Sequence, residues 1–150
     1  MSIKGGFVES GGGWLGSKTR VKILARDFLA DDDATTYGGP FTDELNSTGA
    51  IQVGSTTQEL YAYVPIPTGY KATECRINCA GSIQVRVWSC DINGSSGTEI
   101  SNTITTQYTN AVLSLTETAS TDINFIMVFV YTQQTTAELI YGGYLTIERI

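Results

Sequence analysis

The chain of 150 residues contains no histidine. Imidazole is the commonest general base in enzymes and a frequent zinc ligand, so its absence excludes Ser-His-Asp and Cys-His nucleophile systems and histidine zinc sites. Charged residues are also scarce, at 16% of the chain, and the formal net charge is −6. Nucleic-acid-binding proteins normally carry a basic surface, so we expect no nucleic-acid partner.

Long apolar runs are missing as well. No window approaches the ~20 apolar residues that a membrane-spanning helix needs, so no membrane partner is expected. The first residues, from Met1 to Phe7, lack the apolar run of a signal peptide. We therefore expect a protein that is made in the cytoplasm and used without Sec export.

Cysteine is limited to three residues. Cys75 and Cys79 are four residues apart on one expected strand, a span of about 13 Å, whereas a disulfide needs Cα atoms within about 7 Å. Cys90 has the opposite parity and should face away from Cys75. We expect three buried or half-buried thiols, with no zinc site and no cofactor.

The clearest pattern is an alternation of apolar and polar residues between residues 72 and 88. Its apolar members are Cys75, Ile77, Cys79, Ile83, Val85 and Val87. A period of two is typical of strands with one buried face. The pattern predicts a hairpin in which Ile77 faces Val85 and residues 80–82 form the loop.

Turn residues recur about every ten positions after Ile51, as in β-sandwiches and barrels. We expect strands near residues 58–65, 70–79, 83–92, 99–106, 111–117, 124–132 and 138–148. Residues 124–131 are apolar at both parities, which predicts a central strand covered on each face. Gly142 and Gly143 predict a bulge or a close approach of two backbones. The expected fold is all-β, with a single antiparallel β-sandwich or jelly-roll domain at residues 51–150.

Residues 1–50 are expected to form an extended arm with a short strand or helical turn. Glycine is dense in residues 1–16, and Phe7, Trp14 and Leu15 would be apolar contacts with the core, a capsid or another subunit. Residues 19–33 predict a strand that leads into one helical turn. The acidic group of Asp27 and residues 31–33 lacks the alternating pattern of a calcium loop.

No catalytic or phosphate-binding motif is complete. In residues 11–19 the lysine does not directly follow the second glycine, as a phosphate-binding loop requires. Glycoside hydrolysis needs two acids across a groove, and the acidic residues are scattered along the sequence. They are Glu59, Glu74, Asp91, Glu99, Glu117, Asp122 and Glu138. We expect no enzyme.

The aromatic residues are the best candidates for a binding surface. Tyr61 and Tyr63 share one face of an expected strand, and Trp88, Tyr141 and Tyr144 could lie near them. Tyrosine with one end in water is common at subunit interfaces, and aromatic clusters also suit sugar binding. Both alternatives stay open from the sequence.

Three stretches together resemble small virion structural proteins of tailed bacteriophages, particularly marine and cyanobacterial phages. They are TRVKILARDFLADD at 19–32, YVPIPTGYKAT at 63–73 and IYGGYLTI at 140–147. The resemblance implies a non-enzymatic capsid decoration (cement) protein on the outer capsid surface of the virion, made in the host cytoplasm. Its partners would be the major capsid protein and further copies of itself in a homotrimer. The alternative is a tail or fibre-associated module that binds a host glycan. The cysteine-rich central strand departs from this family.

Overall fold

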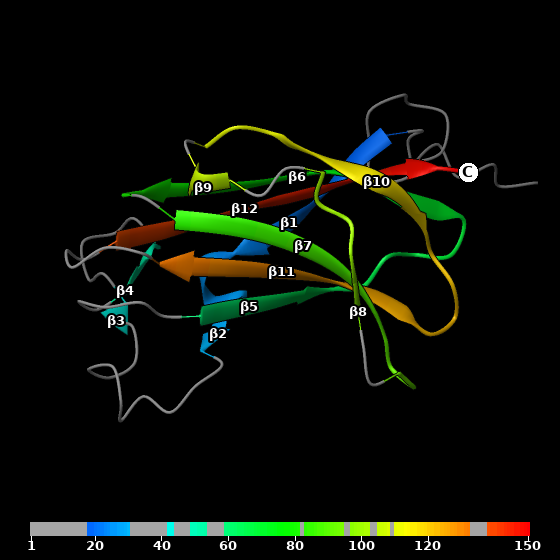
Figure 1. The fold of residues 1–150 in the computed structure, drawn as a ribbon, viewed down its shortest axis with the longest axis horizontal. Coiled ribbons are helices and arrows are strands. Elements are labelled where there is room, and N and C mark those ends of the chain that lie inside the picture. The colour runs from blue at the N-terminus through cyan, green and yellow to red at the C-terminus, as the bar shows by residue number, and fades with distance from the viewer. Residues whose placement is uncertain are drawn as a thin grey trace, which may run out of the picture.

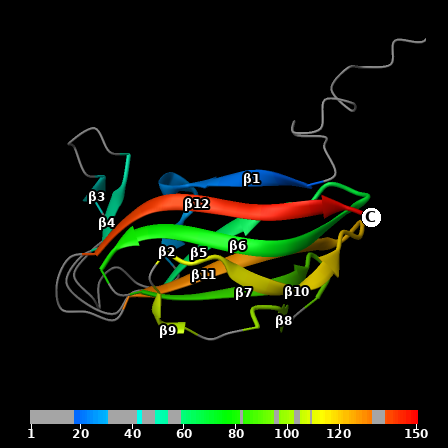
Figure 2. The ribbon, with the colours of Figure 1, turned by 90° about the horizontal axis from the view of Figure 1, so that it is seen from above.

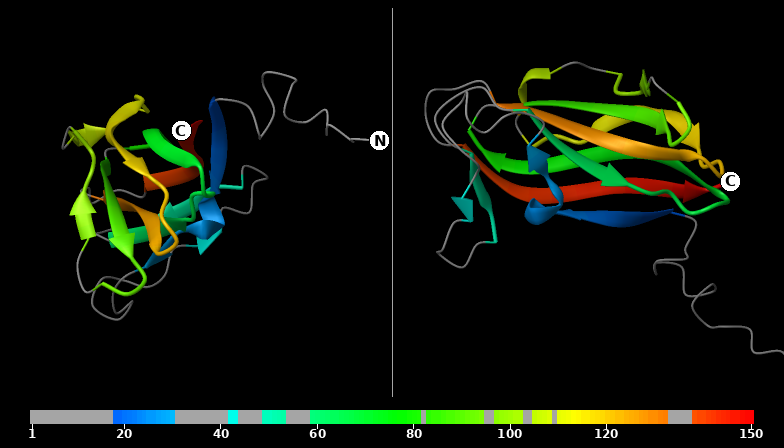
Figure 3. Two further views of the ribbon diagram at one scale, coloured as in Figure 1. Left: turned by 90° about the vertical axis from the view of Figure 1, so that its right-hand side faces the viewer. Right: turned by 90° about the horizontal axis from the view of Figure 1, so that it is seen from below.

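The computed structural model describes residues 18–30, 42–43, 49–53, 59–81, 83–94, 97–102, 105–108, 110–132 and 138–150. Most of them form antiparallel strands in two packed sheets, which Figure 2 and the right-hand view of Figure 3 show as two layers. Within this part of the chain, no helix is both long enough and apolar enough to cross a bilayer.

Among the described residues, each sheet has six strands. Sheet A contains β1 (Lys18–Leu24), β3 (Thr42–Asp43), β4 (Ile51–Val53), β6 (Tyr70–Ala80), β10 (Leu113–Ala119) and β12 (Glu138–Arg149). Sheet B contains β2 (Leu29–Ala30), β5 (Glu59–Val64), β7 (Ile83–Asp91), β8 (Gly97–Glu99), β9 (Thr105–Tyr108) and β11 (Asn124–Thr132). The elements are labelled in Figure 1.

The pairing between strands is nested. β1 pairs with β12, β5 with β11, β6 with β10 and β7 with β8, as in one long hairpin that has been rolled up. The roll then brings β6 beside β12 and β7 beside β11. This double-sheet arrangement is a jelly roll, so the predicted all-β sandwich is confirmed.

The core lies between the inner faces of the two sheets. Its strand residues are apolar at every second position and are almost fully buried, as for Ile77, Val85, Val128 and Leu145. Burial of each such side chain stabilises the fold by about 1.5–3 kcal/mol. Alternate positions on the same strands point outward, so both sheets also present an outer face.

The hairpin predicted for residues 72–88 is wrong in its pairing. The alternation is present, but β6 belongs to sheet A and β7 to sheet B, and the chain crosses between them at Gly81, whose φ is 107°. Ile77 and Val85 line the same core from opposite sheets. Strands that face each other across a sandwich have the same period of two as paired strands, so the pattern could not distinguish them.

Residues 18–30 are part of the sandwich. They form β1 and then one 3₁₀ turn, η1 (Ala25–Asp27), as predicted for a strand leading into a turn. Ile23 and Phe28 are buried in the core. A domain boundary at residue 50 would therefore assign β1 and η1, which belong to the sandwich, to the expected arm of residues 1–50. The predicted contact residues Phe7, Trp14 and Leu15, like the acidic residues 31–33, lie outside the described residues.

Most strand positions agree with the sequence prediction, with one clear exception. The single strand expected at 99–106 is replaced by β8 and β9, which both pair with β7 at different points. The predicted irregularity at Gly142 and Gly143 is confirmed, because the β6–β12 register shifts between Ile140 and Gly142. A Cβ on Gly143 would overlap the carbonyl oxygen of Arg76, so two backbones do approach closely there.

Candidate functional site

The outer face of sheet B carries a continuous set of aromatic side chains. Strand register places Phe129 between Tyr61 on β5 and Arg86 on β7. In the next row, Met127 lies between Tyr63 and Trp88. Directly opposed residues in antiparallel strands share a face, so all these side chains point away from the core.

The rings contact one another across neighbouring strands and along β11. The centroids of Tyr61 and Phe129 are 5.2 Å apart, and those of Phe129 and Tyr131 are 6.3 Å apart with nearly parallel planes. Tyr63 meets Phe125 edge to face at 5.7 Å. Such contacts orient the rings and hold them in place. Tyr63 is still 52% exposed, so part of this aromatic surface faces solvent.

A charged pair borders the aromatic surface. The guanidinium of Arg86 donates two hydrogen bonds to the carboxylate of Glu99, one of them 3.0 Å long from Nε. Ser101 Oγ donates a further hydrogen bond of 2.8 Å to Glu99. The Arg86 hydrogen bonds lower the pKa of Glu99, so this carboxyl is held ionised. Arg86 Cζ also lies 5.2 Å from the centre of the Trp88 ring.

These groups border a groove of about 370 Å³ on the outer face of sheet B. Its lining residues are Glu59, Tyr61, Arg86, Trp88, Cys90, Gly97, Met127 and Phe129. Glu59 accepts a hydrogen bond of 3.3 Å from the Tyr61 hydroxyl at one side of the groove. Volumes of this order, with aromatic walls and a few polar groups, are typical of small-molecule sites.

The groove depends on glycine at one position. A Cβ on Gly97 would lie 2.6 Å from Cys90 Sγ and 3.2 Å from the carbonyl oxygen of Ser89. Glycine on β8 therefore leaves room for the Cys90 thiol beside the groove. Cys90 is half-buried while Cys75 and Cys79 are buried in the core, so the predicted burial of the three thiols is confirmed.

The structure separates the five aromatic residues that the sequence singled out. Tyr61, Tyr63 and Trp88 share the outer face of sheet B, as predicted for the first two. Tyr141 and Tyr144 are on β12 in sheet A, so they do not join this surface.

β11 contributes side chains to the outer surface, whereas the sequence predicts a strand covered on both faces. Its residues are expected to be covered on both faces, but only the parity of Ile126 and Val128 faces the core. Phe125 and Met127, at the other parity, are half-buried on the outer face. The sequence does contain a signal for this, because β-branched residues occupy one parity of the strand and mostly aromatic residues the other.

Within the described residues no three acidic or cysteine side chains converge as a metal site would require. Glu59 lines the groove, and Glu99 borders it opposite Trp88. Glu99 is engaged by Arg86 and Ser101, and its lowered pKa is the opposite of what a general acid needs. The chemistry that the groove supports is binding through stacking and hydrogen bonds.

No protein-family model matches the chain, and no curated protein sequence matches it. The solved structures to which the chain is similar include the CBM36-1 domain of a multidomain xylanase from the hindgut metagenome of Trinervitermes trinervoides. It is 10% identical, with 88% of this chain and 98% of that chain covered and a TM-score of 0.47. A chitosan-binding module from a chitosanase/glucanase of Paenibacillus sp. IK-5 is 12% identical, with 86% and 94% covered and a TM-score of 0.45. A family two carbohydrate esterase from Cellvibrio japonicus is 12% identical, with 89% and 34% covered and a TM-score of 0.40. At these values the likenesses carry no argument about this chain.

Proposed function

We propose that this protein is a non-catalytic carbohydrate-binding module, and that the sheet B groove is its glycan site. The observation that carries the proposal is the row of cross-strand aromatic contacts beside the Arg86–Glu99 pair. The apolar C–H face of a sugar ring packs on a flat aromatic ring, while its hydroxyls need fixed donors and acceptors at the edge. Tyr61 and Trp88 provide the aromatic rings, and Arg86 and Glu59 provide the hydrogen-bonding groups at the edge.

The fixed geometry of the groove supports this function. Its walls are on strands of a sheet, and the Arg86 side chain is held by both Glu99 and the Trp88 ring. A site whose side chains are already ordered loses less conformational entropy when a ligand binds. The groove is on an outer face, so a chain of several sugars can extend beyond the residues that hold one unit.

The test is binding of soluble neutral oligosaccharides, such as xylo-, chito- and galacto-oligosaccharides, measured by calorimetry. Trp88→Ala and Tyr61→Ala should each weaken binding by tenfold or more, since buried aromatic contacts in such sites contribute more than about 1.4 kcal/mol. Tyr141→Ala is the matched control, because it removes an exposed tyrosine from the other sheet. Equal affinity in all four proteins, with unchanged melting temperatures, would contradict the proposal.

A virion location is a second proposal, and the resemblance of residues 19–32, 63–73 and 140–147 to phage structural proteins supports it. A jelly roll is used by both viral capsid and lectin domains, so the fold is compatible with either role. A glycan-binding module on a tail or fibre would combine the two. Antibody-gold labelling of intact particles tests the location. Label over the head would favour the decoration role, and label on the tail would favour a tail-associated glycan-binding role. Unlabelled particles would contradict a virion location and would leave the sheet B proposal to its own test.

A further inference from the structure

The outer face of sheet A carries a cluster of cationic side chains, interspersed with the carboxylates of Glu74, Glu117 and Glu148. Five of the nine lysine and arginine residues of the chain lie on it. They are Lys18, Arg20 and Lys22 on β1, and Lys71 and Arg76 on β6. The three on β1 alternate with inward-facing residues, so they form a row along the outer face.

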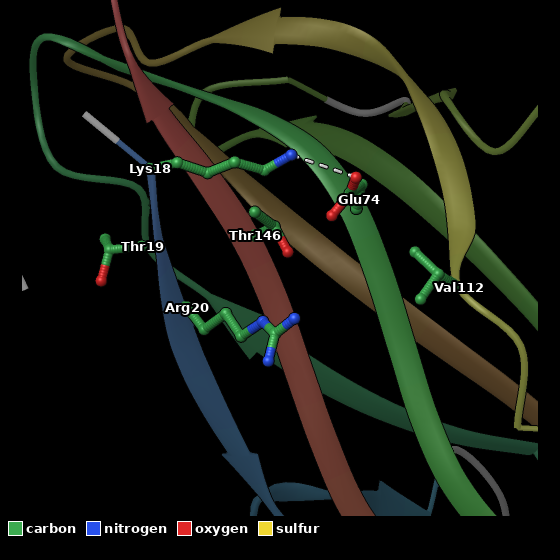
Figure 4. A pocket seen from close by; sticks show the side chains of 6 residues that line it. All are labelled: Lys18, Thr19, Arg20, Glu74, Val112 and Thr146. Carbon is green, nitrogen blue, oxygen red and sulfur yellow. Dashed lines mark hydrogen bonds and ion pairs between the residues drawn. The ribbon is translucent and has the colours of Figure 1, made fainter. Parts of the chain in front are cut away.

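Part of this face is a pocket of about 760 Å³. It is lined by Lys18, Thr19, Arg20, Glu74, Val112 and Thr146, as shown in Figure 4. Register places Thr146 on β12 directly between Arg20 on β1 and Glu74 on β6. Lys18 reaches over β12, and its Nζ lies 3.2 Å from Glu74 Oε1.

The Thr146 hydroxyl is the unusual group in this pocket. Thr146 is only 1% exposed, although it is on an outer face, and its Oγ1 makes no hydrogen bond with any described group. The close-up shows it between the side chains of Lys18 and Arg20. A buried hydroxyl without a partner costs about 1–3 kcal/mol, so a threonine here is unfavourable unless something binds it.

Arg20 is held in position beside this hydroxyl. Its Cζ lies 4.3 Å from the centre of the Tyr144 ring, which stabilises one orientation of the guanidinium. Lys18 is the second cation, on the opposite side of Thr146 in the close-up. The pocket therefore presents two cationic groups around one uncommitted hydroxyl donor, with Lys18 already ion-paired with Glu74. The Arg20 guanidinium and the Thr146 hydroxyl together suit an oxyanion, which would share Lys18 with Glu74.

We propose that the sheet A pocket binds the carboxylate or sulfate group of an acidic sugar residue. The acidic group lies between Lys18 and Arg20 and accepts a hydrogen bond from Thr146. The pocket is much larger than a bare anion, and Val112 forms an apolar wall that a sugar ring can contact. This site is on the opposite outer face from the sheet B groove and does not depend on the function proposed for that groove.

The test uses galacturonate, galactose 6-sulfate, neutral galactose and inorganic sulfate at constant ionic strength, with affinities measured by calorimetry or by NMR. The two acidic sugars should bind and galactose should not. Thr146→Val and Arg20→Gln should each weaken binding by about tenfold, as expected for loss of a hydrogen bond to a charged group. Without ligand, Thr146→Val should be as stable as the wild type or more stable, because it removes an unpartnered buried hydroxyl.

Two control variants separate a defined pocket from general charge attraction and from binding at the sheet B groove. Lys22→Gln removes the same charge one outward position further along β1, beyond the pocket, and should change affinity by less than about twofold at moderate salt. Equal weakening in Lys22→Gln and Arg20→Gln would show diffuse charge attraction and overturn the proposal. Trp88→Ala alters only the sheet B groove, so it should bind acidic sugars as tightly as the wild type. The two proposals can therefore fail independently.

Inorganic sulfate distinguishes a sugar site from a free-anion site. If it binds as tightly as galactose 6-sulfate, with the same dependence on Thr146, the pocket is an oxyanion site for a free anion and the sugar assignment is overturned. Absence of binding by every anion would overturn the site itself, and so would affinity that is unaffected by Thr146→Val.

Discussion

The side-chain amide of Asn110 pairs with the peptide of Cys79 as a neighbouring strand would. The Cys79 N–H donates to Asn110 Oδ1 at 2.7 Å, and Asn110 Nδ2 donates to the Cys79 carbonyl oxygen at 3.1 Å. β10 pairs with β6 only as far as Cys75, so the amide continues the hydrogen bonding beyond the last residue of that pairing. Asn110 has a φ of 60°, a conformation that asparagine tolerates better than most residues.

Asn110→Ala should therefore lower the free energy of unfolding by about 2–4 kcal/mol, from two lost hydrogen bonds and left-handed strain. Asn110→Gly loses the same hydrogen bonds without the strain, so it should be about 1 kcal/mol more stable than Asn110→Ala. Urea unfolding measures both values. If Asn110→Ala were as stable as the wild type, the amide would not be completing the edge of β6.

Gly143→Ala should be among the most destabilising substitutions in the sandwich. Its Cβ would overlap the carbonyl oxygen of Arg76 on the neighbouring strand, and a backbone atom cannot move aside as a flexible side chain can. We expect a loss of more than about 3 kcal/mol. Gly69→Ala is the matched control, because Gly69 has a φ of 85° but open space around its Cβ position, so only about 1–2 kcal/mol should be lost. Thermal unfolding of the two variants should rank them in that order, and the reverse order would contradict the close approach.

The Arg86–Glu99 pair predicts a particular loss of stability in acid. The folded-state pKa of Glu99 is lowered, so its contribution is present above the unfolded pKa of about 4.3 and is lost as pH falls through the lower folded value. The wild type should therefore lose more melting temperature between about pH 5 and pH 3 than Glu99→Gln does. Arg86→Gln should show the same reduced acid dependence, because it removes the main cause of the lowered pKa. Parallel pH profiles in all three proteins would show that the pair is not coupled to folding.

The thiols should differ sharply in reactivity. Burial raises the pKa of Cys75 to about 12 and that of Cys79 to about 11, and both side chains are covered by the core. Cys90 lines the groove, so native protein at pH 8 should react with a thiol reagent at Cys90 first, and all three cysteines should react after denaturation. Labelled Cys90 should also weaken oligosaccharide binding by filling the groove. Cys90→Ser should bind sugar normally and resist labelling in the native state, and sugar binding that survives full labelling would place the ligand elsewhere.

The fold could be predicted from sequence as far as the strands, but the pairing of those strands could not. The alternation of apolar and polar residues indicates that Ile77 and Val85 are both buried. It does not indicate which sheet each strand joins. In a jelly roll, neighbouring strands in the chain often belong to opposite sheets, so a short loop such as the one at Gly81 does not imply a hairpin.

The binding surface was partly predictable for a similar reason. Tyr61 and Tyr63 share a face because they are on one strand. Their contact with Phe129 and Phe125 needs β5 beside β11, and only the three-dimensional pairing provides that. The sheet A pocket was not predictable at all, since Arg20, Glu74 and Thr146 are distant in the chain and meet only through strand register.

The pairing of Lys18 with Glu148 brings the first described strand to begin where the last strand ends. A support attached to the start of β1 or to the end of β12 would hold the sandwich at the same end. Both outer faces would then remain accessible. The two proposed sites lie on those opposite faces, so a single tethered copy could bridge two glycan chains. Several copies on one support would then cross-link a polysaccharide layer, with an avidity that exceeds the affinity of either single site.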